Sequence, residues 1–154
     1  GSTRMLVQSV NGGSSKNYGF DLYGRAKMGD VSPWASYSYV NFTEDQGDET
    51  SGPAGISRHN VRLGATWAPT ARLFVTPSLV WRSTPLNVTG GPLEDELNNP
   101  YEINLYLLYR LSRKVDTFLS VRNLSNHKYA LGGVTGDAEP QETFSSVAGI
   151  NVKF

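Results

Sequence analysis

The segment Tyr101–Leu111, YEINLYLLYRL, alternates between apolar and polar side chains along most of its length. Its odd positions carry Tyr, Ile, Leu, Leu, Tyr and Leu, and its even positions include Glu102, Asn104 and Arg110. Successive side chains of a β-strand point to opposite faces of a sheet. The segment therefore predicts a strand with one apolar and one polar face.

The same alternation recurs along the chain, and no segment shows a convincing helical period. It predicts an all-β fold, an antiparallel meander of about seven strands. The predicted strands span residues 5–28, 31–43, 56–68, 72–84, 100–112, 115–127 and 142–154. The first is ambiguous, because the glycines of VNGGSSKN permit either a bulge in one long strand or a hairpin turn. We favour one long strand; a turn would make eight.

Short and long connections alternate along the chain. Gly-Asp after Met28, APTA after Trp67 and SRK after Leu111 are short. The segments 44–55, 85–99 and 130–141 are long, polar and rich in Gly and Pro. In an antiparallel meander, all long loops then share one end of the sheet. Transmembrane barrels combine brief periplasmic turns with longer external loops, whereas a soluble sandwich has no reason to do so.

The aromatic residues form two groups on the apolar face. Trp67 and Tyr109 lie beside short turns, and Trp81 and Tyr101 lie beside long loops. Two belts separated by one strand length match the interfacial girdles of outer-membrane barrels. The alternative is that these side chains fill the core of a soluble protein.

Composition excludes several classes of protein. The 154 residues suffice for one domain, and 14 basic residues balance 14 acidic ones, so no nucleic-acid partner is predicted. Cysteine is absent, which excludes disulfides and thiolate metal sites. No apolar stretch approaches the roughly 18 residues of a transmembrane helix. The opening Gly-Ser-Thr, residues 1–3, looks like a cloning scar, so we expect that a natural N-terminus has been removed.

No catalytic, metal or cofactor site is predicted. The two histidines, His59 and His127, lack partners at ligand spacing, and no nucleophile elbow is visible. The acidic residues within 44–49 lack the order of ligands of an EF-hand. We interpret them as a solvated external loop and expect that the chain is not an enzyme.

Four motifs resemble the C-terminal end of a TonB-dependent outer-membrane receptor. They are VNGGSSKNYGFDLYG (10–24), ISRHNVRLGATWAPT (56–70), VRNLSNHKY (121–129) and INVKF (150–154). The third carries the Asn123-Leu124 pair followed by Lys128-Tyr129. Two features of the family are missing: the proline before His59 and the Pro-Gly-Arg before the last strand.

The resemblance implies that residues 4–154 are the C-terminal segment of a barrel of about 22 strands, with the plug domain absent. The whole receptor would take up a scarce ligand, such as a ferric siderophore, across the bacterial outer membrane. Implied partners are outer-membrane lipid, the rest of the barrel and its plug, the barrel-insertion machinery, and TonB only through the absent plug. A closed eight-strand outer-membrane barrel with an adhesive or scaffold role, and a soluble β-barrel or sandwich, are the alternatives.

Residue roles follow from the two faces and the resemblance, while ligand-binding residues stay unassigned. The predicted lipid-facing residues are Leu105, Leu107, Leu119, Val121, Ile150 and Val152. The predicted lumen-facing polar residues are Asp21, Arg25, Glu102, Asn104, Arg110, Asp116, Arg122 and Asn151. In the whole receptor they would contact the plug or line its seam; the alternative is that they only solvate the lumen. The predicted assembly signal in the last strand comprises Phe144, Ile150, Val152 and Phe154. We expect the strand to leave the lipid zone at Asn123, with SNHKY as its polar extension.

Overall fold

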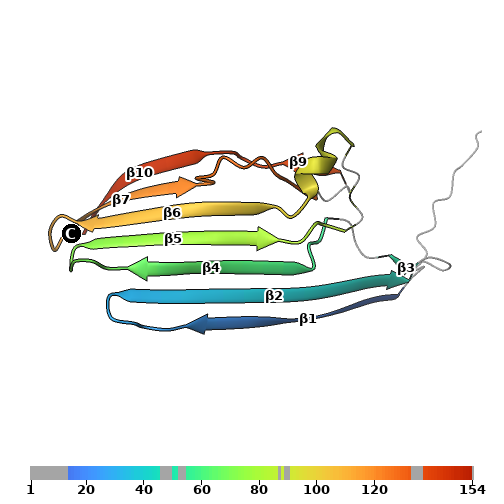
Figure 1. The fold of residues 1–154 in the computed structure, drawn as a ribbon, viewed down its shortest axis with the longest axis horizontal. Coiled ribbons are helices and arrows are strands. Elements are labelled where there is room, and N and C mark those ends of the chain that lie inside the picture. The colour runs from blue at the N-terminus through green and yellow to red at the C-terminus, as the bar shows by residue number, and fades with distance from the viewer. Residues whose placement is uncertain are drawn as a thin grey trace, which may run out of the picture.

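The protein forms one antiparallel meander, seen in a computed structural model that describes residues 14–45, 50–51, 55–86, 88, 91–132 and 137–153. The strand order is β1-β2-β4-β5-β6-β7-β10 (Figure 1). The strands are β1 (Ser14–Arg25), β2 (Val31–Asp45), β4 (His59–Trp67), β5 (Leu73–Arg82), β6 (Tyr101–Arg110), β7 (Val115–Arg122) and β10 (Ser145–Val152). The predicted all-β meander is confirmed. The predictions for residues 5–13 and Phe154 lie outside the described residues.

Three short strands and one short 3₁₀ helix lie in the long connections. The strand β3 (Thr50–Ser51) pairs with the end of β2, and β8 (Ala130–Gly132) pairs with β9 (Ala138–Pro140). The segment 85–99, expected to be irregular, contains the 3₁₀ helix η1 (Gly91–Leu97). Among the described residues, no helix is long and apolar enough to cross a membrane.

The predicted strand 115–127 is too long at its C-terminal end. β7 ends at Arg122, and the next residue, Asn123, has a φ of 48°. A left-handed backbone cannot continue a strand, and asparagine is one of the few residues that adopts it readily. The segment SNHKY is therefore a folded loop and not an extension of the strand.

The register joins the apolar sides of the strands into one continuous face. Leu107 lies directly opposite Val75 on one side and Leu119 on the other. Leu105 likewise lies opposite Val121, and Ile150 shares this face through its pairing with Thr117. In this register the six predicted lipid-facing residues share one face, and the predicted lumen-facing residues share the other. That these faces meet lipid and lumen stays a prediction.

The long connections share one end of the sheet, as expected. Figure 1 shows the turns β1–β2, β4–β5 and β6–β7 at the end where the C-terminus lies, and the long connections at the opposite end. We call these the turn end and the outer end. The predicted topology of alternating short and long connections is confirmed.

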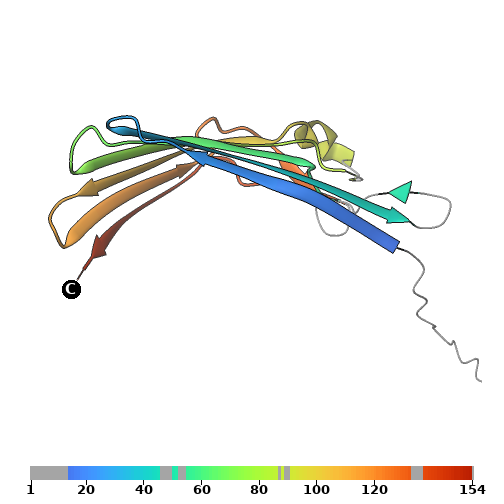
Figure 2. The ribbon, with the colours of Figure 1, turned by 90° about the horizontal axis from the view of Figure 1, so that it is seen from below.

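The sheet is a single curved layer whose two edges stay open (Figure 2). Within the described residues, β1 pairs only with β2, and β10 pairs only with β7. A closed small barrel would pair β1 with β10, and a sandwich would add a second sheet over the first. Neither alternative matches this arrangement.

The sheet has almost no core of its own. Among the described residues, the buried hydrophobic ones are Leu97, Val121, Tyr129 and Ala130. Large side chains such as Phe20, Leu22, Leu63 and Ile150 are at least 43% exposed on the apolar face. An apolar face that exposes several large side chains marks a surface that is covered by another apolar phase or by a partner.

Arginine substitutions at Leu119 and Ser120 test the two faces at one depth. These neighbours lie mid-strand on opposite faces of β7, where Leu119 opposes Leu107 and Ser120 opposes Tyr106. Arginine on a lipid-facing side at the midplane costs about 2–4 kcal/mol, whereas the lumen side tolerates it. We therefore expect Leu119→Arg to lower the unfolding free energy of the lipid-refolded complete receptor by that amount and Ser120→Arg to have little effect. Equal losses in a urea titration contradict the assignment of faces.

Candidate functional site

The loop after β7 is built around the side chain of Asn123, which is 1% exposed. Its Nδ2 donates to the His127 carbonyl at 2.7 Å and to the Glu142 carbonyl at 3.4 Å. Its Oδ1 accepts from the His127 N–H at 2.9 Å and from the Ser125 hydroxyl at 3.3 Å. One amide side chain thus provides the hydrogen bonds that a strand partner would otherwise give this loop.

A second asparagine fastens the loop to the start of β10. Asn126 also has a left-handed φ of 51°, and its N–H donates to the Asn123 carbonyl at 2.8 Å. Its Oδ1 accepts from the Phe144 N–H at 3.1 Å. The Leu124 N–H donates to the Ile103 carbonyl of β6 at 2.7 Å. The loop is thereby held between β6 and β10.

Glu102 is the centre of a charged cluster beside this loop. Its carboxylate is held by the Arg122 guanidinium, with Nε–Oε1 at 3.4 Å and Nη2–Oε2 at 3.3 Å. The Tyr129 hydroxyl donates to Oε2 at 2.8 Å. Glu102 is only 6% exposed, and these donors compensate its burial. Asn104 lies next to this cluster and accepts from the Asn123 N–H at 2.9 Å.

Tyr129 carries the strongest electrostatic perturbation outside the strands of the meander. Burial, followed by its hydrogen bond to the Glu102 carboxylate and the negative charge of that group, raises the pKa of Tyr129 to about 12. All three causes favour the neutral phenol, because burial disfavours a charged group and ionisation would place a second negative charge beside Glu102. Because its hydroxyl stays protonated, Tyr129 remains a hydrogen-bond donor to Glu102.

Aromatic side chains gather at the outer end on the apolar face. Tyr101 lies opposite Trp81 in register, and its ring stacks on His127 with centroids 4.0 Å apart. On the neighbouring strands, the Tyr37 hydroxyl hydrogen-bonds with His59 Nδ1 at 2.8 Å.

The outer aromatic group is wider than the sequence predicted. Tyr18, Phe20, Tyr37, Tyr39 and His59 extend it across β1, β2 and β4. The sequence signal was present, since Tyr37 and Tyr39 alternate within one strand. At the turn end, Trp67 and Tyr109 lie on the apolar face and are 47% and 41% exposed. Their role as a girdle stays a prediction.

The three long connections meet in one outer loop cluster, comprising residues 55–58, 83–86, 88, 91–100, 123–132 and 137–142. The Gly55 N–H donates to the Leu86 carbonyl at 2.9 Å, and the Leu86 N–H donates to the Ile56 carbonyl at 3.1 Å. Gly132 packs so closely on Gly55 and Val88 that a Cβ at this position would collide with both. This close approach requires glycine.

The apolar core of the protein lies in this outer loop cluster. Leu97 of η1, Pro100, Tyr129 and Ala130 are all buried, and η1 contacts the β8–β9 hairpin. In the β-sheet itself, by contrast, most large apolar side chains are partly exposed. The cluster is therefore a compact platform at the end where the long loops gather.

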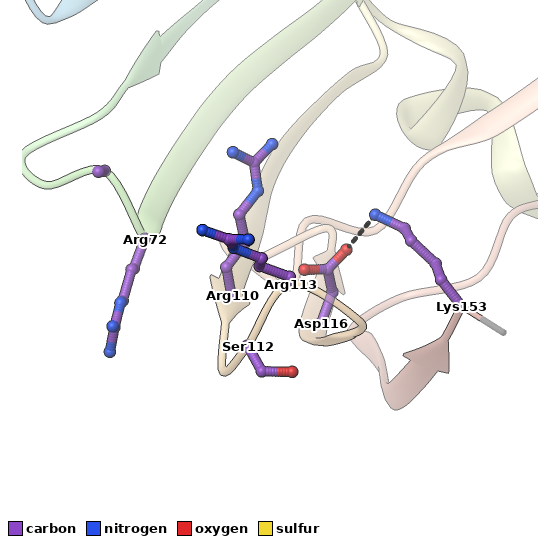
Figure 3. A pocket seen from close by; sticks show the side chains of 7 residues that line it. Arg72, Arg110, Ser112, Arg113, Asp116 and Lys153 are labelled. Atoms are coloured by element: carbon purple, nitrogen blue, oxygen red, sulfur yellow. Dashed lines mark hydrogen bonds and ion pairs between the residues drawn. The ribbon is translucent and has the colours of Figure 1, made fainter.

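The turn end of the polar face holds a hollow of about 450 Å³ (Figure 3). Its polar lining is Arg72, Arg110, Ser112, Arg113, Asp116 and Lys153. Arg110 and Asp116 were predicted to face the lumen, whereas Arg72, Arg113 and Lys153 were missed because two of them lie in turns and one lies beyond β10. Within the described residues, no group of three or more His, Cys, Asp or Glu side chains is placed to hold a metal ion.

The structure divides the predicted lumen-facing residues into three places. Glu102, Asn104 and Arg122 meet at the outer end, and Arg110 and Asp116 meet at the turn end. Asp21 and Arg25 lie on the polar side of β1, opposite Ser38 and Trp34 of β2. Asn151 lies opposite Asp116 at the turn end, so the predicted polar set is two clusters plus the edge strand β1.

The structure describes only part of the predicted assembly signal. Ile150 and Val152 lie on the apolar face of β10, opposite Thr117 and Val115. Phe144 precedes β10 and is 51% exposed. Phe154 lies outside the described residues, so the signal itself stays a prediction.

Substitutions of Asn123 separate its side chain from its backbone conformation. Asn123→Ala loses the amide hydrogen bonds, worth about 1–3 kcal/mol, and strains the left-handed backbone by about 1–2 kcal/mol. Asn123→Gly loses only the hydrogen bonds. In denaturant titrations we expect the alanine variant to be the less stable by about 1–2 kcal/mol. Asn151→Ala, on the exposed polar side of β10, is the control. If Asn123→Ala and Asn123→Gly are both as stable as the unsubstituted protein, Asn123 does not stabilise the loop.

Alkaline titration tests the pairing of Tyr129 with Glu102. The unfolded phenol ionises near pH 10.0 and the folded one near pH 12. The contribution of Tyr129 to the free energy of unfolding is therefore fully present below pH 10.0. On the order of 2 kcal/mol of it is lost as pH rises toward 12. The difference in tyrosinate absorbance between the protein and Tyr129→Phe should show one phenol ionising near pH 12. Glu102→Gln should lower that pKa; an unchanged midpoint contradicts the pairing.

The comparisons with known proteins agree with this architecture. Residues 1–124 match the family described as TonB dependent receptor-like, beta-barrel. The fold is similar to the crystal structure of the siderophore receptor PiuA from Acinetobacter baumannii, with a TM-score of 0.68 and 17% sequence identity. The similarity covers 92% of this chain and 22% of the PiuA chain, and at this identity it shows the fold alone. No curated protein matches the chain in sequence.

The family match covers most of the chain, from the segment before β1 to the Asn123-Leu124 pair. The order of the strands and the alternation of short and long connections agree with this match. The chain belongs to the TonB dependent receptor-like β-barrel family.

Proposed function

We propose that this chain forms the C-terminal part of the barrel of an outer-membrane receptor for active uptake of a scarce ligand such as a ferric siderophore. The observation that carries the proposal is the single-layer sheet with one continuous apolar face and one polar face. In a membrane the apolar face contacts lipid, and the polar face lines the lumen.

The open edges support a larger barrel. Unpaired backbone groups at a sheet edge are not tolerated in a lipid environment, so β1 and β10 need further strands as partners. The chain spans only 22% of the similar siderophore receptor, which leaves room for those strands and for a plug. TonB would supply energy to the whole receptor through that plug.

The outer loop cluster fits the extracellular end of such a receptor. Its loops are joined by backbone hydrogen bonds and packed around Leu97 and Ala130, so they form a preorganised surface. A ligand arriving from outside would meet this surface together with the loops of the remaining barrel. Preorganised surfaces bind with a lower entropic cost than mobile ones.

Uptake by cells that express the complete receptor tests this function. The probe is radioactive iron bound to the siderophores recovered from an iron-starved culture of the source bacterium. We expect energy-dependent accumulation of iron that is lost when either the receptor or TonB is deleted. Accumulation that persists without TonB, or a receptor that fractionates away from the outer membrane, contradicts the proposal.

We further propose that the last strand is read during assembly. β10 is amphipathic and unpaired on its outer edge in the described residues, so it offers backbone donors and acceptors to the insertion machinery. Deletion of Phe154 from the complete receptor should lower its level at the cell surface and leave refolding in detergent nearly intact. Equal losses in both assays mean that Phe154 is structural only.

A further inference from the structure

The three short turns of the sheet carry an excess of positive charge. The turns comprise residues 26–30, 68–72 and 111–114. They contain four basic residues and one acidic residue, Asp30, for a net charge of +3. The basic residues are Lys27, Arg72, Arg113 and Lys114, and all four are exposed.

The opposite end of the sheet carries the reverse charge. The residues of the outer loop cluster include six acidic and two basic ones, for a net charge of −4. The positive excess is thus a property of the turn end and not of the connections in general. An anionic surface would be attracted to the turn end and repelled by the outer end.

No carboxylate neutralises the basic residues of the turns within the described part of the chain. The ion pairs there are Arg122–Glu102 and Lys153–Asp116. Figure 3 shows Arg72 pointing away from the second of these pairs, in which the Asp116 carboxylate is held by Lys153 at 3.0 Å. The positive charge of the turns is therefore available to an anionic partner.

Exposed apolar side chains flank the same turns. Met28, Trp67 and Leu111 are 68%, 47% and 51% exposed. Trp67 belongs to the apolar face, where it lies opposite Val75. The turn end thus combines apolar anchors with cations, a combination by which proteins bind the interface of an anionic membrane.

We propose that the turn end binds the phosphate head groups of anionic phospholipids; this proposal rests on the function proposed above. In the proposed barrel the apolar face ends at the turns, so the turns lie at the level of the head groups. Lysine and arginine side chains at this level extend their charged ends to the phosphates, while their stems lie along apolar surface. Each basic residue near an anionic membrane strengthens the attraction by about fivefold.

Two observations favour a membrane surface over an acidic protein. The basic residues are distributed over the turns β1–β2, β4–β5 and β6–β7, so they form a band along one end of the sheet (Figure 1). The apolar residues beside them continue the face that meets lipid in the proposed receptor. An extended, negatively charged surface that borders an apolar phase matches both features.

Photo-crosslinking to lipid in the complete receptor tests the proposal. The photo-crosslinker p-benzoylphenylalanine replaces Leu111, which is exposed beside Arg113 and Lys114. The receptor is reconstituted in vesicles of equal parts phosphatidylglycerol and phosphatidylcholine, and mass spectrometry identifies the crosslinked lipid. We expect phosphatidylglycerol to exceed phosphatidylcholine by about fivefold or more. The excess should disappear in Arg113→Gln/Lys114→Gln and shrink at high salt.

Two controls separate local binding from overall charge. Arg58→Gln/Lys128→Gln removes the same charge from the outer loop cluster and should leave the excess unchanged. The photo-crosslinker in place of Tyr101, at the outer end of the same strand β6, should capture both lipids equally. Heat-modifiable migration in gels confirms that each variant is folded.

Several outcomes overturn the proposal. They are equal capture of the two lipids at Leu111, an excess that persists without Arg113 and Lys114, the same excess at Tyr101, a crosslinked peptide in place of lipid, or no product. Iron uptake reports on the proposed function separately. Uptake without a phosphatidylglycerol excess refutes only the lipid site, and an excess without TonB-dependent uptake refutes only the proposed function.

Discussion

Direct pairing between neighbouring antiparallel strands is the constraint on which the rest of the structure depends. Each residue lies opposite its partner, so a strand that alternates apolar and polar side chains imposes its faces on the next strand. The rows continue from β1 to β10, as with Leu63, Leu79 and Ile103 across three strands. A slip of one residue anywhere would turn the apolar side of one strand onto the polar face of the sheet.

This constraint leaves the sheet without a core and assigns the compact packing to its outer end. A single layer buries little apolar area, and in the proposed barrel its stability comes from the surroundings of the apolar face and from closure with further strands. The outer loop cluster is different, because Leu97, Tyr129 and Ala130 are buried there and Asn123 replaces missing backbone partners. The β-sheet and the outer loop cluster are thus stabilised by different physical means.

The sequence predicted the features that depend on local periodicity. Alternation located the seven strands and their faces, and loop length assigned the two ends. It failed where distant residues decide the structure. The Asn123 side chain holds the end of β7 through hydrogen bonds to carbonyls of later residues. Tyr129 hydrogen-bonds with Glu102, which lies 27 positions earlier in the sequence.

The basic hollow was missed for a similar reason. Two turns, β6, β7 and the residue after β10 contribute to it, and no single segment shows an unusual charge. The 3₁₀ helix η1 was also missed, because its contacts with β8 and β9 form only after the chain has folded.

In the proposed receptor, one face of this sheet meets lipid and the other meets water. The chain has no native cysteine, so single cysteines can be placed at each position from Tyr101 to Arg110 of β6 in the complete receptor and spin-labelled in lipid vesicles. We expect a strict period of two, with odd positions accessible to oxygen dissolved in lipid and even positions accessible to an aqueous nickel complex. Equal accessibility of odd and even positions to both reagents would contradict it.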